Sequence, residues 1–226
     1  MLYREIIHKL KKLSNPESVA GMQRFGIQSK HMLGISMPTL RALAKDLGEN
    51  HKLALQLWNS GIHDAQILAT MVDIPELVTE KQMEQWVIEF DSWAICDQCC
   101  NNLFYKTPFA YRKAVKWSKR KEEYVKRAGF VLMAVLAVHD QDATDKQFLS
   151  FLPIIKRESG DPRNFVKKAV NWALRQIGKR NRILNQAAID AACQIQQLDS
   201  KPARWIAADA LRELTNANLK TKKQKN

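Results

Sequence analysis

The sequence predicts an all-α fold, organised as a solenoid of antiparallel helix pairs. Apolar residues recur at helical spacing along nearly the whole chain, and no stretch alternates long enough with the period of two that a half-buried strand requires. Short segments also repeat at about forty residues, which is the period of HEAT and armadillo helix pairs. Proline and capping residues stand where helices are expected to begin.

The repeat lies in the second half of the chain. The segment 124–128 (Tyr-Val-Lys-Arg-Ala) is echoed by 165–169 (Phe-Val-Lys-Lys-Ala) and more loosely by 204–208 (Arg-Trp-Ile-Ala-Ala). Each helix pair of such an array buries one face against its neighbours, and the stack leaves a long concave surface for a ligand. No linker-like stretch divides the sequence, so we expect one domain over residues 1–218, followed by a basic, disordered tail at 219–226.

Helix ends are marked by particular residue pairs. Asn15-Pro16, Thr107-Pro108 and Asp161-Pro162 each place a good N-cap residue before a proline, which is well tolerated at the first helical position. Gly48 follows Leu47 where a glycine commonly ends a helix. We therefore expect helices to begin at residues 16, 108 and 162, and one to end at residue 47.

The charge of the chain points to a polyanionic partner. The net charge is +13 and the sequence pI is about 9.7, and a field of that sign attracts nucleic acid and speeds its association. Four lysines belong to the predicted tail, and removing them from +13 leaves +9 on the rest. The basic character is therefore a property of the expected solenoid.

Cysteine usage and hydropathy predict a soluble, unexported, cytoplasmic protein. Cys96, Cys99 and Cys100 crowd about one turn of an expected helix, unlike the spread cysteines of a disulfide framework. No second Cys-x-x-Cys and no nearby histidine completes a zinc site, so we expect buried thiols and no metal. The longest apolar runs fall short of the ~18 residues that could span a membrane.

Trp93 and Asp97 form the first candidate for chemistry. They stand four residues apart on one face of a helix that Ser92 can cap. A fixed carboxylate stabilises an oxocarbenium-like sugar and orients an attacking water, and an aromatic face attracts the same cation. The alternative is that Asp97 is only an ion-pair partner for a lysine or arginine.

A second candidate is a basic helix face in the region 162–179. Lys168, Trp172, Arg175 and Lys179 share one face of this helix, so one aromatic side chain sits among three cations. Such a row can grip phosphates, with the tryptophan held against a sugar. The alternative is a solvated basic face with the tryptophan lodged between helices.

Arg127 is a third candidate, near the beginning of another helix. An arginine can clamp a phosphate through two hydrogen bonds, a geometry to which lysine is less suited. The alternative is an ordinary exposed arginine paired with Glu123, one turn earlier.

These residues resemble the DNA alkylation repair family, the AlkD-like HEAT-repeat alkylpurine DNA glycosylases. The segment 91–97 resembles the family's Trp-x-x-x-Asp element, 124–128 its arginine-bearing helix start, and 165–175 its Lys-Ala-x-x-Trp-x-Leu-Arg segment. Further matches at 15–17 and 34–41 extend the similarity from near the N-terminus to about residue 179. Three such elements in the same order over most of a chain are fairly specific.

The resemblance implies a right-handed, C-shaped solenoid of HEAT-like pairs that holds double-stranded DNA in its basic concavity. It implies hydrolysis of the N-glycosidic bond of N3- or N7-alkylated purines without base flipping, by a monomer that needs no cofactor and no obligate protein partner. The implied roles place Asp97 at the sugar cation, Trp93 and Trp172 on the deoxyribose, and Arg127 on a phosphate.

The sequence also departs from the family pattern. Phe25 stands at a DNA-contacting position where a tyrosine is expected, and Ala94 and Cys96 replace bulkier or more polar residues between Trp93 and Asp97. Two other functions therefore stay open: a non-catalytic HEAT-like protein that binds distorted or branched DNA, and a scaffold that grips acidic proteins.

Overall fold

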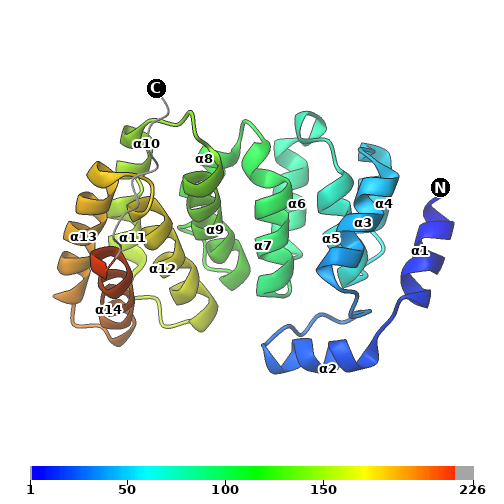
Figure 1. The fold of residues 1–226 in the computed structure, drawn as a ribbon, viewed down its shortest axis with the longest axis horizontal. Helices are drawn as coiled ribbons and strands as arrows, with labels where there is room; N and C mark the ends of the chain where they lie inside the picture. The colour runs from blue at the N-terminus through cyan, green and yellow to red at the C-terminus, as the bar shows by residue number, and fades with distance from the viewer. Residues whose placement is uncertain (1, 217–226) are drawn as a thin grey trace. The chain divides into compact units, whose positions relative to one another are not determined.

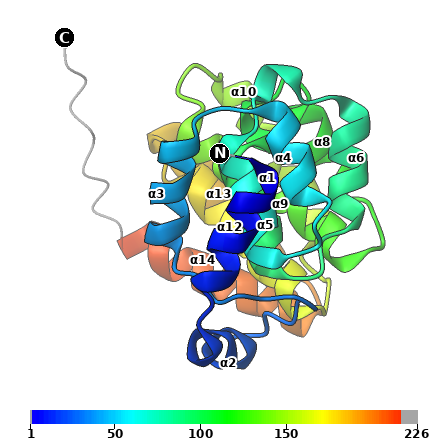
Figure 2. The same ribbon diagram turned by 90° about the vertical axis from the view of Figure 1, so that its right-hand side faces the viewer.

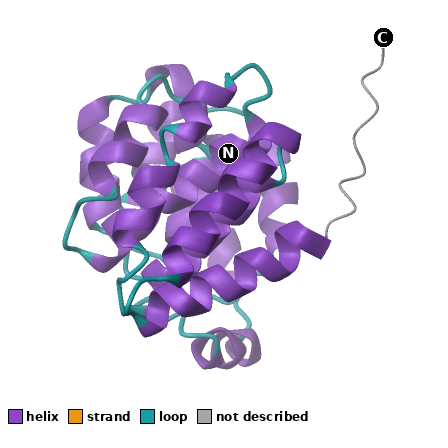
Figure 3. Cartoon of the chain, turned by 90° about the vertical axis from the view of Figure 1, so that its left-hand side faces the viewer, coloured by secondary structure: helices purple, strands orange, loops and turns teal. Residues whose placement is uncertain are grey.

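The computed structural model describes residues 2–216, and every regular element in this range is a helix (Figures 1 and 3). The predicted all-α fold is confirmed. The predicted tail at 219–226 lies outside the described residues. By its internal packing the chain divides into two compact units, Met1–Phe109 and Ala110–Asn226, and each is described by itself. One domain over residues 1–218 stays a prediction.

The first unit is built around a buried central helix, α5. This helix packs against α3, α4 and α7, and α1 lies against α4 and α5. Trp58 of α4 and Trp86 of α6 stack with their ring centroids 3.9 Å apart, so an aromatic contact joins these two helices. In order, the elements are α1 (Tyr3–Lys12), α2 (Pro16–Arg24), α3 (Met37–Leu47), α4 (His51–Trp58), α5 (His63–Val72), the 3-10 turn η1 (Pro75–Leu77), α6 (Glu80–Ile88), α7 (Trp93–Asn102) and the 3-10 turn η2 (Phe104–Lys106).

Helix α2 stands apart from the other helices of the first unit (Figures 1 and 2). None of its residues is buried, whereas every other α-helix of this unit buries at least two. Its start is as predicted, because the Asn15 side chain accepts a hydrogen bond from the Ser18 amide ahead of Pro16. The predicted end of α3 is also confirmed, since Gly48 caps it with a positive φ of 66°.

The second unit is a stack of helices of unequal length, from five residues in the shortest to seventeen in the longest. Helix α9 packs between α8 and α12, and α12 contacts both α13 and α14. Helix α9 is buried over most of its length, so it forms the centre of the unit. The elements are α8 (Ala110–Trp117), α9 (Glu123–His139), α10 (Asp145–Leu149), α11 (Leu152–Glu158), α12 (Asn164–Gly178), α13 (Arg182–Gln196) and α14 (Lys201–Asn216).

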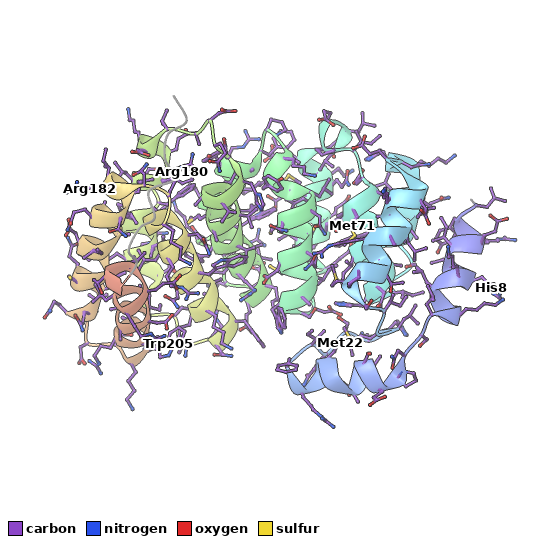
Figure 4. The ribbon with its side chains drawn as sticks, in the orientation of Figure 1. His8, Met22, Met71, Arg180, Arg182 and Trp205 are labelled. Carbon is purple, nitrogen blue, oxygen red and sulfur yellow. The ribbon has the colours of Figure 1, made fainter. Side chains whose placement is uncertain are left out.

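Several contacts of this unit join residues about one predicted repeat apart. The Arg127 guanidinium on α9 bonds the Phe165 carbonyl, 38 residues on, and Asn171 on α12 bonds Asp209 on α14 across the same 38 residues. Lys167 likewise lies over the ring of Trp205, labelled in Figure 4, at 4.5 Å from its centroid. Helices about one repeat apart, α9 with α12 and α12 with α14, therefore pack side by side, as in a tandem array of helix pairs.

Two of the predicted helix starts are wrong by two residues. Helix α12 begins at Asn164 and is capped by Arg163, and α8 begins at Ala110. In the first case the Asp161 carboxylate is engaged elsewhere, since it accepts hydrogen bonds from the Arg163 side chain and from Lys126 Nζ. The Asp161 carboxylate is thus occupied mainly by Arg163, two residues on, and also by the distant Lys126.

Candidate functional site

Helix α7 carries the aromatic–carboxylate pair. Ser92 is buried and caps the helix by accepting a hydrogen bond from the Ile95 amide at 3.4 Å, as the sequence predicts. Trp93 and Asp97 are one turn apart and both half-buried, while the intervening Cys96 is fully buried on the other side. The helix therefore presents an indole and a carboxylate together on one surface.

Phe25 lies next to this pair. It follows the last residue of α2, and its carbonyl oxygen accepts a hydrogen bond from Trp93 Nε1 at 3.0 Å. The phenylalanine side chain itself is 75% exposed. The first unit thus brings together three of the predicted site residues, Phe25, Trp93 and Asp97, with the Trp93 indole held by a backbone acceptor.

A buried polar cluster holds the loop that follows Phe25. The Ser29 hydroxyl donates to Asp91 Oδ1 at 2.6 Å and lies 2.9 Å from His63 Nδ1. Because the single hydroxyl proton goes to Asp91, the Ser29 oxygen accepts from His63 Nδ1, and in the neutral imidazole Nε2 then carries no proton. Two further anchors come from Asp64, whose carboxylate accepts the amides of Leu33 and Ile35 at 2.7 and 2.8 Å.

The protonation state of His63 follows from its surroundings. Burial lowers the pKa of His63 below its ordinary value of 6.5, and the nearby carboxylates of Asp64 and Asp91 oppose this only in part. Within the described part of the chain, buried Nε2 has no hydrogen-bond partner, so a proton there would be unsolvated. In the sequence, the only sign of this cluster is the pair of polar residues, His63 and Asp64, at the start of an apolar helix.

Arg127 is buried in the second unit. The residue is only 6% exposed, and its Nη1 donates a hydrogen bond to the Phe165 carbonyl at 2.5 Å. The alternative of an ordinary exposed arginine is therefore wrong. The guanidinium joins α9 to the first turn of α12, and its role as a phosphate clamp stays a prediction.

The basic face of α12 is partly neutralised by α14. Arg175 Nη1 lies 2.5 Å from Glu213 Oε2 and 3.5 Å from an Asp209 oxygen, and Lys179 pairs with the same Glu213. Burial alone would raise the pKa of Glu213, but hydrogen bonds and charge from Lys179 and Arg175 outweigh it, so this pKa lies below its ordinary value. Lys168 is exposed and Trp172 half-buried on the same helix. The two carboxylates are not part of the predicted site, although Glu213 and Asp209 lie about one repeat after Arg175 and Asn171.

No group of three or more histidine, cysteine, aspartate or glutamate side chains among residues 2–216 is placed to hold a metal ion. Over the same residues, no helix combines the length and the apolar character that crossing a membrane requires.

The fold and these side chains define a HEAT-like helical-repeat protein with an aromatic–carboxylate pair on one repeat helix. Residues 6–214 match the family model described as "DNA alkylation repair enzyme", and the chain belongs to this family. A curated relative is an uncharacterised protein, Lin0241, of Listeria innocua serovar 6a (strain ATCC BAA-680 / CLIP 11262), 23% identical over 188 residues that cover 81% of this chain and 82% of the relative.

A solved structure has the same fold. It is described as representing "a new family of proteins related to the HEAT-like repeat DNA glycosylases with affinity for branched DNA structures". The TM-score is 0.78 at 18% identity, with 95% of this chain and 96% of the other chain covered. The HEAT-like repeat architecture predicted from the sequence is thereby confirmed.

Proposed function

We propose that this protein is an alkylpurine DNA glycosylase, which hydrolyses the N-glycosidic bond of purines alkylated at N3 or N7 in double-stranded DNA. The observation that carries the proposal is the pair formed by Trp93 and Asp97 on one surface of α7, with the indole N–H held by the Phe25 carbonyl. Membership of the DNA alkylation repair family supports the same reaction class.

In the proposed reaction the bond between C1′ and the purine nitrogen breaks, and its electron pair leaves with the base. An N3- or N7-alkylated purine already carries a positive charge, so it leaves as a neutral base and needs no general acid. The carboxylate of Asp97 stabilises the positive charge that develops on the sugar, and it takes a proton from the water that attacks C1′. The Trp93 face attracts the same cation through its quadrupole.

The second unit supplies the grip on DNA in this proposal. Trp172 packs on the deoxyribose, Arg127 holds a backbone phosphate, and the basic residues of α12 follow the strand. These residues are Lys168 and Arg175 of α12, with Lys179 at its C-terminal cap. Phosphate contacts fix the register without reading sequence, which suits a protein that searches all DNA for damage. The protein works as a monomer in the cytoplasm, without a cofactor, and leaves the lesion stacked.

The proposal is tested by measuring release of 7-methylguanine and 3-methyladenine from methylated duplex DNA. We expect Asp97→Asn to slow release by about 100-fold or more, the usual effect of removing one group that stabilises transition-state charge. Asp46→Asn is the matched control, because it makes the same change at an exposed carboxylate of α3 and should leave the rate unchanged. Equal rates for the native protein and Asp97→Asn, or no release by the native protein, would overturn the assignment.

The second candidate is a non-catalytic protein that binds distorted or branched DNA. The observation that favours it is the structural likeness to a protein from a family with affinity for branched DNA. Salt-sensitive DNA binding without base release would support this candidate. Displacement of the DNA by an acidic peptide at equal charge concentration would instead favour a scaffold for acidic proteins.

A further inference from the structure

A cavity lies between α4 and α6 in the first unit, away from the residues of the proposed reaction. Its lining side chains come from residues 51–59 and 79–89, which are the two helices and their cap residues, and Phe25, Trp93 and Asp97 are not among them. The cavity holds about 440 Å³. Sites for small molecules usually measure roughly 300–1,000 Å³, so a ligand of that kind fits.

Helices α4 and α6 run in the same direction. At one end His51, the first residue of α4, shares the carboxylate of Asp73 with Gln82 in the first turn of α6. The His51 Nδ1 atom lies 2.6 Å from Asp73 Oδ1, and Gln82 Nε2 donates to Oδ2 at 2.7 Å. At the other end Trp58, the last residue of α4, donates from Nε1 to Glu89, the C-cap residue of α6, at 2.7 Å. The two N-termini therefore lie together, and so do the two C-termini.

The N-terminal end of the cavity offers hydrogen-bond donors and positive charge, and we call it the donor end (His51, Thr79 and Lys81). Lys81 is exposed and forms no ion pair with any of residues 2–216. Buried Asp73 holds the His51 ring through Nδ1, which leaves Nε2 to donate to an anion when the ring is protonated. The dipoles of both helices add partial positive charge at this end.

The C-terminal end of the cavity has the opposite character, and we call it the acceptor end (Asn59 and Glu89). Both residues are exposed, and the Glu89 carboxylate accepts the Trp58 indole N–H through Oε2. No cation of the described chain forms an ion pair with Glu89. The helix dipoles are negative at this end. From His51 to Asn59 the helix advances by about 12 Å, which separates the two ends.

We infer that this cavity binds a short free peptide, with the peptide carboxylate at the donor end and its ammonium group at the acceptor end. An extended chain advances by about 3.3–3.6 Å per residue, so about three or four residues bridge the two ends. A single amino acid is too short to reach both. Half-buried Leu55 lines the cavity between the two ends and provides an apolar contact for the peptide. This binding is independent of the proposed action on DNA.

The first test titrates the full-length protein with tetra-alanine in four forms: with both ends free, N-acetylated, C-amidated, and with both ends blocked. The readout is the indole N–H signal of Trp58 in a nitrogen-15 NMR spectrum, because this N–H is bonded to Glu89 at the acceptor end. We expect saturable binding of the free peptide. Blocking either end should weaken binding by about tenfold, the usual effect of losing one hydrogen bond to a charged group.

The second test assigns each peptide end to its side chain. Lys81→Gln should weaken binding of the free peptide by about tenfold and leave binding of the C-amidated form unchanged, because the amide carries no charge for Lys81 to pair with. Lys52→Gln is the matched control, since Lys52 is an exposed cation next to His51 that does not line the cavity. Its affinity for the free peptide should equal that of the native protein.

Glu89→Gln tests the acceptor end. Glutamine can still accept the Trp58 indole N–H, but it lacks the charge that attracts an ammonium group. Binding of the free peptide should weaken, and binding of the N-acetylated form should stay the same. Equal binding of all four peptides, dependence on only one peptide end, or no saturable change in the Trp58 signal would overturn the inference. Because no DNA is present, these results do not depend on base release or on Asp97.

Discussion

The indole N–H of Trp93 donates to the carbonyl oxygen of Phe25 at 3.0 Å and joins α7 to the end of α2 across 68 positions of sequence. This bond fixes the orientation of an aromatic ring in the candidate site by means of a helix that otherwise buries nothing. This hydrogen bond thus couples α2 to α7.

Trp93→Phe tests this coupling, because it keeps an aromatic ring and removes the donor. We expect the free energy of unfolding to fall by about 1 kcal/mol, the usual net contribution of one hydrogen bond. Amide exchange should rise in residues 25–33 and stay unchanged in the second unit. Urea unfolding and hydrogen–deuterium exchange measure the two effects, and an unchanged exchange pattern would show that the bond does not hold the loop.

The stability of the protein should depend on the protonation of His63. The folded-state pKa of His63 lies below 6.5, so the unfolded chain takes up the proton first as pH falls through 6.5. Stability contributed by the neutral imidazole is therefore present above pH 6.5 and is lost as pH falls below it. His63→Asn, which can preserve the bond to Ser29, should show a flatter decline between pH 7 and 5 in urea unfolding. His8→Asn, at an exposed position, should follow the native protein.

Glu213→Gln should strengthen DNA binding. Lys179 loses its anionic partner and Arg175 loses the nearer of its two, since Asp209 remains 3.5 Å away, so more of their charge becomes available to phosphate. We expect a gain in affinity of roughly three- to tenfold at low salt and a steeper salt dependence, measured by anisotropy on continuous duplex. Asp190→Asn on α13 makes the same charge change without releasing a cation and should give a smaller gain. Equal gains from the two variants would mean that the α12 face does not touch DNA.

Gly129→Ala should destabilise the second unit strongly. A methyl group at this position would lie 2.5 Å from the Ser118 amide nitrogen and 2.9 Å from the Ala114 carbonyl oxygen, and neither backbone atom can move freely. We expect a loss of about 1–3 kcal/mol in the free energy of unfolding. Gly21→Ala on α2 is the control, because nothing lies within 4 Å of the added carbon and alanine favours the helix. A native-like midpoint for Gly129→Ala would contradict the close packing of α8 on α9.

Much of the fold could be predicted because it depends on local spacing. The caps formed by Asn15 and Ser92 and the glycine at position 48 are set by residues within one turn, and all three are confirmed. The start of α12 could not be predicted in the same way. Asp161 is locally suited to cap a helix, but its carboxylate is taken by Arg163 and Lys126, the second of which is 35 residues away.

In the candidate site too, the local relations could be predicted from the sequence, and most of the long-range contacts could not. The one-turn relation of Trp93 to Asp97 follows from helical geometry and needs no tertiary information. The bond from Ser29 to Asp91 spans 62 residues without any repeat to suggest it. The pairing of Arg175 with Glu213 also joins distant residues, yet its separation of 38 residues is close to the predicted repeat of about forty, so the repeat could have suggested that their helices pack together. An internal repeat therefore allows some contacts between distant residues to be predicted from one sequence.

The three cysteines of α7 bear on how the protein withstands electrophiles. Cys96, Cys99 and Cys100 are fully buried, and burial, together with Cys96 and Asp73, raises the pKa of Cys99. A protonated, enclosed thiol is a poor nucleophile, so brief treatment of the native protein with iodoacetamide should label Cys193, which is exposed, and spare the other three. The reagents that methylate DNA also attack thiolates. The helix that carries Asp97 would thus stay unmodified under the chemical stress that creates its proposed substrate.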